Sequence, residues 1–171
     1  MGNDTVSAVS LRSKLLGFIA LMKLRVVELL LITTVPTMIV AEEGLPSVWL
    51  IVATLLGGTL AAGGANAINM YIDRDIDKLM ERTKNRPLVT GVLTSTEALS
   101  FAILIEVIAF VWLWIFVNLL SAVLAASACL FYVFIYSLWL KRSSSSIIVI
   151  GGAAGAVPVL IGWSSVTNSI D

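Results

Sequence analysis

Five apolar runs follow one another along the chain, and short polar segments separate them. The runs are Val26–Ala41, Val48–Met70, Ala98–Val117, Leu119–Leu140 and Ile147–Val166. Each is close to the roughly 17–25 residues that a helix needs to cross a bilayer. The first run is short unless Leu15–Leu24 lies along the membrane interface and leads into it, and only Asn118 separates the third run from the fourth. The pattern predicts an all-α, polytopic integral membrane fold with five transmembrane helices and a tight turn at Asn118.

Composition supports the membrane assignment and excludes several kinds of site. Of the 171 residues, 58% are hydrophobic and 13% are charged, and mean hydropathy is +1.00. A soluble core of this size does not need so much apolar surface, so the lipid bilayer is the expected surrounding. The formal net charge is zero, which gives no basis for nucleic-acid binding. There is no histidine, and the single cysteine, Cys129, is predicted to pack in its apolar run.

Basic residues indicate the orientation in the membrane. All 11 Lys and Arg residues lie before the first run, after the second or after the fourth, and the remaining connections and the tail have none. Cytoplasmic loops of membrane proteins carry the excess of Lys and Arg. The N-terminus and the segment after the second run are therefore predicted to face the cytoplasm, and this alternation agrees with five crossings.

The end of the second run leads into the most densely charged segment. Residues Asp73–Arg86 include four acidic and five basic side chains, and Asn69, Asp73 and Asp77 recur every four residues. Four residues of an α-helix advance by about 400°, so these three side chains share one stripe and Asp75 points away. Carboxylate and amide oxygens suit Mg²⁺, which usually takes one or two protein carboxylates together with phosphate oxygens of a substrate. The sequence therefore predicts a Mg²⁺ site on this stripe, and the crowded acids require a cation or a basic partner.

Basic residues follow the acidic stripe closely. Pro87 and Gly91 stop a helix and turn the chain back, which predicts that Arg82, Lys84 and Arg86 lie within reach of the stripe. The alternative interpretation is that these cations only set the membrane topology. Acids that hold Mg²⁺ next to bases that bind phosphate suit a leaving diphosphate, because both stabilise the negative charge that develops as a carbon–oxygen bond breaks. In a membrane, the matching substrate is a polyprenyl diphosphate.

Two further features lie inside the apolar runs. Glu106 has no partner near it in sequence, and a carboxylate inside the membrane is costly and indicates a function that the sequence does not define. Glycines in the second and fifth runs predict close helix packing: Gly57, Gly58, Gly63, Gly64, Gly151, Gly152 and Gly155.

These motifs are similar to those of a known family. The pattern Asn69-x-x-x-Asp73-x-x-x-Asp77, followed by Arg82-Thr-x-x-Arg86-Pro-Leu, resembles the first aspartate-rich motif of the UbiA superfamily of intramembrane prenyltransferases. Three longer stretches resemble its haem-farnesylating branch in particular: residues 69–91, 23–33 and 150–163. Together they span most of the chain.

The resemblance implies both an architecture and a reaction. The architecture is a nine-helix bundle, of which this chain would be the N-terminal part: one incomplete membrane domain, with the aspartate-rich motif on a cytoplasmic loop at residues 71–96. The reaction is transfer of a farnesyl group from farnesyl diphosphate to a vinyl group of haem B, which gives haem O. The implied location is the inner (plasma) membrane. A haem A synthase or a terminal oxidase assembly is a candidate partner.

The resemblance also implies roles for particular residues. Asn69, Asp73 and Asp77 would be the catalytic residues that hold Mg²⁺ and the diphosphate. The residues that would bind the diphosphate directly are Arg82, Lys84, Arg86, Lys23 and Arg25.

One departure from the family and two alternative functions bear on this expectation. Family members carry a second aspartate-rich motif opposite the first, whereas the only acidic residue after Glu106 here is Asp171, so we expect the chain to be inactive alone. The first alternative is prenyl transfer to a quinone precursor or another acceptor. The second is a membrane carrier or cation-binding bundle that uses the acidic stripe as an ion site, which would place acids near the middle of the membrane on facing spans.

Overall fold

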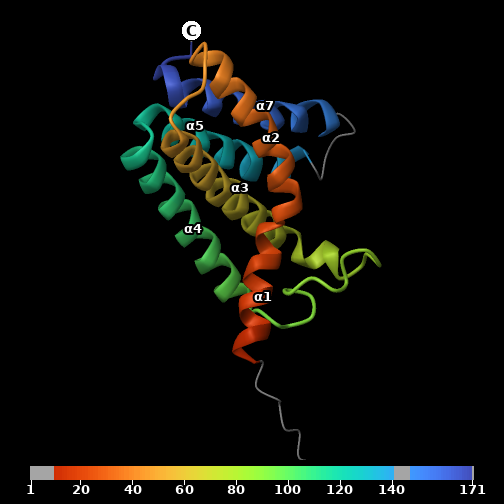
Figure 1. Cartoon of the computed structure of the whole chain (residues 1–171). Coiled ribbons are helices and arrows are strands. Elements are labelled where there is room, and N and C mark those ends of the chain that lie inside the picture. The colour runs from red at the N-terminus through yellow and green to blue at the C-terminus, as the bar shows by residue number, and fades with distance from the viewer. Residues whose placement is uncertain (1–9, 141–146, 171) are drawn as a thin grey trace, which may run out of the picture.

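The described part of the chain is entirely helical. A computed structural model describes residues 10–140 and 147–170, so the basic pair Lys141 and Arg142 lies outside it. The elements are α1 (Leu11–Met22), α2 (Leu24–Ala41), α3 (Val48–Asp77), α4 (Ser95–Phe116), α5 (Leu119–Leu130), the π-helix η1 (Phe131–Leu140) and α7 (Ile147–Thr167) (Figure 1). No strand occurs in these residues, and the predicted all-α class is confirmed.

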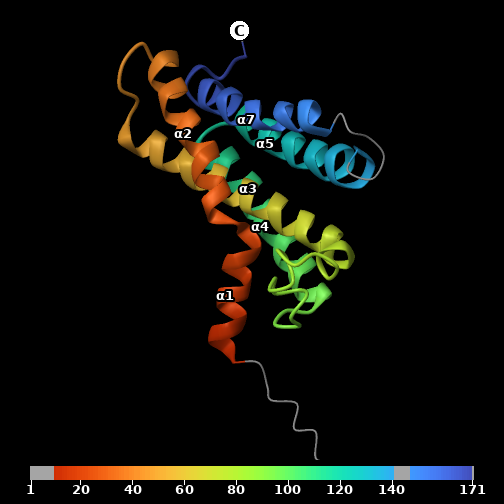
Figure 2. The same cartoon turned by 90° about the vertical axis from the view of Figure 1, so that its right-hand side faces the viewer.

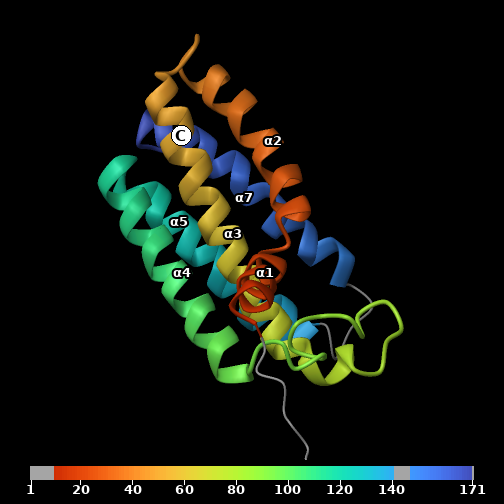
Figure 3. The ribbon, with the colours of Figure 1, turned by 60° about the horizontal axis from the view of Figure 1, so that its bottom comes forward.

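Helix α3 is the centre of the arrangement. It packs along α4 and also contacts α1, α2, α5, η1 and α7. Figures 1 and 2 show α5 and α7 running next to each other on one side of α3, and α2 packs against α7. Figure 3, a view from below, shows α1 almost end-on beside α3. The end of α3, the start of α4 and the segment that connects them therefore lie at the same end of the molecule as α1.

Capping side chains determine where the helices begin. Ser47 accepts a hydrogen bond from the Leu50 amide at the start of α3. Thr94 and Glu97 form a capping box at the start of α4, in which each side chain accepts from the backbone N–H of the other. Asn118 caps α5 by accepting from the Ser121 amide at 2.8 Å. Because α4 ends at Phe116 and α5 starts at Leu119, the predicted tight turn at Asn118 is confirmed.

A single residue separates α1 from α2. Lys23 has a φ of 50°, in the left-handed region, so it ends one helix and begins the next in a different direction. The stretch ahead of the first apolar run is thus a helix of its own. Several apolar side chains on it are exposed: Leu11, Leu15, Leu16 and Ile19.

Two helices in the described residues are long and apolar enough to cross a membrane, judged by length and composition: α3 and α4. Three shorter apolar helical segments overlap the first, fourth and fifth predicted runs: Leu31–Ala41, Leu119–Ile135 and Gly155–Thr167. The fourth run is not a single α-helix, because α5 continues directly into η1. The predicted number of five spans therefore depends on these three shorter segments.

The glycines divide into two groups. A Cβ atom on Gly63 would lie 2.5 Å from the Met22 side chain, and one on Gly64 would lie 2.7 Å from the Glu106 carboxylate. Gly57 is similarly closed off by Leu113, and a Cβ on Gly58 would lie 3.3 Å from the Leu31 side chain, so close packing is confirmed at these four positions. Gly155 differs, because among the side chains that the structure describes nothing lies within 4 Å of such a Cβ, and Gly155 lines a cavity. Gly151 and Gly152 lie where the structure describes only the backbone.

Candidate active site

The last turns of α3 carry the predicted acidic stripe. Asn69, Asp73 and Asp77 are only 4%, 3% and 4% exposed, whereas Asp75 is exposed on the other side of the helix. The Asn69 side-chain amide donates to an Asp73 carboxylate oxygen at 3.0 Å. The helix thus presents one amide and two carboxylates along a single buried face, and the arrangement expected from the four-residue spacing is confirmed.

Arg86 supplies the basic partner that the stripe requires. Its guanidinium donates to an Asp77 carboxylate oxygen at 2.5 Å, and the two side chains are 21% and 5% exposed, respectively. A charge-assisted hydrogen bond of this kind is about twice as strong as a neutral one. Asp77 is therefore neutralised within the chain, and the guanidinium stands next to the stripe.

The connection between α3 and α4 turns back as expected, but it is shorter than the loop predicted at residues 71–96. Residues 71–77 still belong to α3 and α4 begins at Ser95, so the acidic stripe lies on a helix and not on the loop. Residues 78–94 make a series of tight turns rather than a helix, and Gly91 takes a φ of +76°. The Thr83 hydroxyl donates to the Asp77 backbone carbonyl at 2.9 Å, which fixes the first turn after α3. The Leu93 amide donates to the Pro87 carbonyl at 3.2 Å, and the Leu93 side chain is buried at 1% exposure in a core with α1, α3 and α4. This anchor holds Arg86 against the end of α3.

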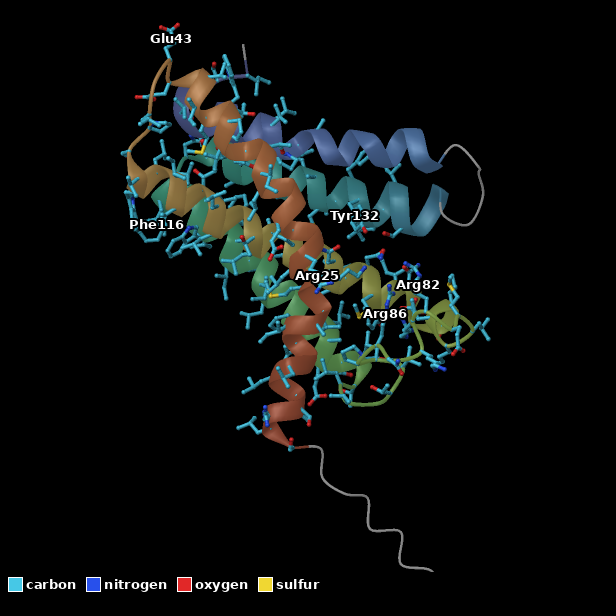
Figure 4. All side chains as sticks on the ribbon, turned by 45° about the vertical axis from the view of Figure 1, so that its right-hand side comes forward. Arg25, Glu43, Arg82, Arg86, Phe116 and Tyr132 are labelled. Carbon is cyan, nitrogen blue, oxygen red and sulfur yellow. The ribbon has the colours of Figure 1, made fainter. Side chains whose placement is uncertain are left out.

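The other predicted phosphate-binding residues lie farther out. Arg82 is exposed, and the exposed Lys84 pairs with Glu81, so the structure does not bring Lys84 to the acidic stripe. Lys23 is half-buried and Arg25 is exposed, and both line an open pocket at the junction of α1 and α2. In Figure 4, the labelled arginines Arg25, Arg82 and Arg86 lie around the same end of α3.

Two polar contacts to this site were missed from the sequence. The Ser137 hydroxyl of η1 donates to the Asn69 side-chain oxygen at 3.3 Å. Ser137 lies in an apolar run, and nothing in the sequence of that run indicates a contact with Asn69. Asn66, which lies three residues before Asn69 and is 7% exposed, donates to the Met22 carbonyl at 3.1 Å. Because Asn66 lies on the same side of α3 as Asn69, the sequence could have indicated that Asn66 belongs to this site. These bonds fix the stripe against α1 and η1.

The donor atoms fit a metal ion that is shared with a substrate rather than one enclosed by protein. Among the described residues, no group of three or more His, Cys, Asp or Glu side chains is arranged to hold a metal. The stripe offers two carboxylates and one amide oxygen, and Arg86 already engages one of the carboxylates. Mg²⁺ is usually bound through one or two carboxylates plus substrate phosphates. The set therefore suits Mg²⁺ only together with a phosphorylated ligand.

An apolar cavity of about 260 Å³ begins beside the stripe. Along α3 it extends from Asn66, near the acidic residues, to Thr54, which is twelve residues or about 18 Å away. Its other walls come from α2, α5, η1 and α7, and its lining includes Leu31, Thr34, Gly58, Ala61, Ala65, Ala125, Cys129, Tyr132, Gly155, Val157 and Ile161. Figure 4 shows Tyr132 on the side of the bundle that faces the arginines. The charged end of α3 and the apolar cavity therefore lie next to each other.

The chain is similar to known proteins over most of its length. Residues 30–171 match the profile of the UbiA prenyltransferase family. A protoheme IX farnesyltransferase of Frankia alni is 59% identical over 160 residues, which cover 94% of this chain and 55% of that protein. One of Clavibacter michiganensis subsp. michiganensis is 57% identical over 162 residues, covering 95% and 53%, and one of Streptomyces avermitilis is 58% identical over 154 residues, covering 90% and 50%.

The chain spans about half the length of these curated relatives. No solved structure matches it. The family profile covers the whole chain from residue 30 onward, including the acidic stripe, Arg86 and the helices that enclose the cavity. The chain therefore belongs to the UbiA prenyltransferase family and is an integral membrane protein.

Proposed function

We propose that the protein containing this chain transfers a farnesyl group from farnesyl diphosphate to a vinyl group of haem B, forming haem O. The observation that carries the proposal is the buried acidic stripe, whose Asp77 pairs with Arg86, next to an apolar cavity. A prenyl diphosphate has the same two parts, a charged head and an apolar tail. The choice of haem B as acceptor rests on the identity of more than 50% to protoheme IX farnesyltransferases over most of this chain.

The polar end of the site has the chemistry to bind the diphosphate. Asp73 and Asp77, with the Asn69 side-chain oxygen, would hold Mg²⁺ together with the diphosphate oxygens. The bound ion would offset the negative charge that develops on the leaving group. Arg86 lies next to Asp77 and would bind the diphosphate directly, with Arg82 nearby. Lys84 would first have to leave Glu81.

Lys23 and Arg25 would complete the basic rim from the junction of α1 and α2, where they line one pocket. The cavity along α3 would take the farnesyl tail. The polar end of the site would face the cytoplasm, because the distribution of Lys and Arg along the chain places the segment after α3 on that side. The five predicted runs would each cross the inner membrane, as part of a nine-helix bundle in the whole protein, with the loop after α3 on the cytoplasmic side.

The reaction follows from the separation of charge that this site favours. Ionisation of the allylic diphosphate would break the carbon–oxygen bond, leaving the electron pair on diphosphate and a farnesyl cation at the mouth of the cavity. The vinyl carbon of haem B would then form the new carbon–carbon bond. Addition of water to the resulting cation, with loss of a proton, would complete the hydroxyethylfarnesyl group. The apolar walls would exclude water from the first cation until the carbon–carbon bond has formed.

The test is complementation with the full-length gene in a bacterial strain that lacks haem O synthase, followed by analysis of extracted haems. We expect haem O with the wild type and its loss with Asp73→Ala or Asp77→Ala. Asp75→Ala is the matched control, because Asp75 is exposed on the opposite side of the same helix and should leave haem O unchanged. A prenylated quinone in place of haem O would support the alternative acceptor and contradict the proposal.

The isolated chain provides a second test. Because the second aspartate-rich motif of the family is absent from these residues, we expect purified residues 1–171 to be inactive with haem B and farnesyl diphosphate. Turnover by this chain alone would show that a single acidic motif is sufficient.

A further inference from the structure

A buried carboxyl group on α4 lies next to the cavity but has no role in the mechanism above. Glu106 stands in the middle of this long apolar helix, and its Oε1 atom is buried without a hydrogen-bond partner in the described part of the chain. None of the ion pairs among the described residues involves it. A carboxyl group in the apolar part of a membrane protein is costly and is retained mainly for function.

The packing of α3 against α4 leaves space for this carboxyl group. A Cβ atom on Gly64 would lie 2.7 Å from Glu106 Oε1 and 2.9 Å from its Cγ, so only glycine fits at this position without displacing the side chain. The absence of a side chain at Gly64 therefore leaves the space that the Glu106 carboxyl group occupies. Helix contact alone would be satisfied by an apolar side chain, and a carboxyl group adds nothing to apolar packing.

The position of Glu106 relates it to the cavity. Its carboxyl group lies beside the Cys129 thiol and the Ala65 backbone, and both of these residues line the cavity wall. Ala65 precedes Asp73 by eight residues of one continuous helix, which is about 12 Å along its axis. The carboxyl group therefore lies beside two residues of the cavity wall, about 12 Å along α3 from the level of Asp73.

We propose that Glu106 is a positioning residue whose charge stabilises the carbocation formed in the cavity. The inference rests on the proposed function, because that reaction generates positive charge at the mouth of the cavity. Charges in an apolar, water-excluded site interact far more strongly than in water, so a carboxylate need not touch the reacting carbon to lower its energy. The developing positive charge in turn favours the ionised carboxyl group.

The experiment measures steady-state kinetics of the full-length protein with farnesyl diphosphate and haem B. For Glu106→Gln, which keeps the shape and removes the charge, we expect kcat to fall about tenfold or more while KM for farnesyl diphosphate stays unchanged. Glu106→Asp, which restores the charge at a slightly different place, should recover part of kcat. Glu97→Gln is the control on the same helix, since Glu97 lies in the first turn of α4, away from the cavity, and it should leave kcat unchanged.

Each outcome decides between the inference and its alternatives. If Glu106→Gln keeps the wild-type kcat, Glu106 has only a structural role and the inference is wrong. If this variant does not accumulate in the membrane, Gly64→Ala tests the same point by displacing a charged carboxyl group, and an unchanged kcat there would also overturn the inference. A wild-type protein that forms no haem O contradicts the proposed function and the inference together. Wild-type activity with no effect of Glu106→Gln contradicts the inference alone.

Discussion

Removal of Arg86 should destabilise the protein more than removal of its partner Asp77. The two side chains form one ion pair, but they are buried unequally, at 21% and 5% exposure. Arg86→Ala leaves a carboxylate that has almost no access to water and no other ion-pair partner among the described residues. Asp77→Ala leaves a guanidinium that reaches solvent at the rim of the site. The difference in burial therefore predicts unequal costs for breaking the same pair.

The expected magnitudes follow from this asymmetry. Removing one partner of a fully buried ion pair costs about 3–5 kcal/mol. We expect about 3 kcal/mol for Arg86→Ala, since part of this pair is exposed, and about 1 kcal/mol for Asp77→Ala, close to the value for exposed pairs. Lys84→Ala is the matched control, because its pair with Glu81 is 52% and 85% exposed and should contribute less than about 1 kcal/mol.

The assay is equilibrium denaturation of the purified full-length protein in detergent micelles, with the free energy of unfolding as the measured quantity. Mg²⁺ added together with inorganic diphosphate should restore part of the stability of Arg86→Ala, because a cation at the stripe replaces the lost positive charge. At a concentration 100 times its Kd, an ion that binds only the folded state adds about 2.7 kcal/mol. Equal costs for the two alanine variants, or a larger cost for Asp77→Ala, would refute the reasoning from burial.

Three further changes test the packing around the site in the same assay. Gly57→Ala should cost about 1–3 kcal/mol, because its Cβ would overlap the Leu113 side chain of α4. Leu93→Ala should cost about 2–4 kcal/mol, because this buried side chain anchors the connection after α3, and limited proteolysis should then cleave that connection faster. Thr83→Val removes the hydroxyl that donates to the Asp77 carbonyl and should cost about 1 kcal/mol, whereas Thr83→Ser should be nearly neutral.

The acidic stripe was predictable from sequence because it depends on one helix. The relative directions of Asn69, Asp73 and Asp77 follow from helical geometry, which the fold does not change as long as the helix continues. The basic partner was not predictable to the same degree. Whether Arg86 or Lys84 meets the stripe depends on the turns after Asp77, and only the structure gives their direction.

Contacts between different helices were the hardest to predict. Ser137 contacts Asn69 because η1 passes the end of α3. The sequence around a single polar residue in an apolar run does not indicate which residue that side chain will contact. Glu106 and Cys129 meet for a similar reason, since their helices have apolar residues on every side and hence no periodic pattern. The same limit explains the glycines. Close packing at Gly64 and open space at Gly155 both depend on what the neighbouring helix places opposite them.

A single continuous helix, α3, carries the acidic stripe, one wall of the cavity and the glycine next to Glu106. This 30-residue helix contributes the acidic stripe in its last turns, one wall of the cavity above it, and Gly64, against which Glu106 packs. A helix is stiff along its axis, so the distance of about 28 Å from Asp73 to Thr54 at the far end of the cavity is fixed by the residue count alone. The small residues on its cavity side leave room for an apolar tail, while its Ser47 cap and its packing along α4 keep it helical throughout. In the proposed function, this one helix would therefore bind the charged head of the substrate and set the depth available to its apolar tail.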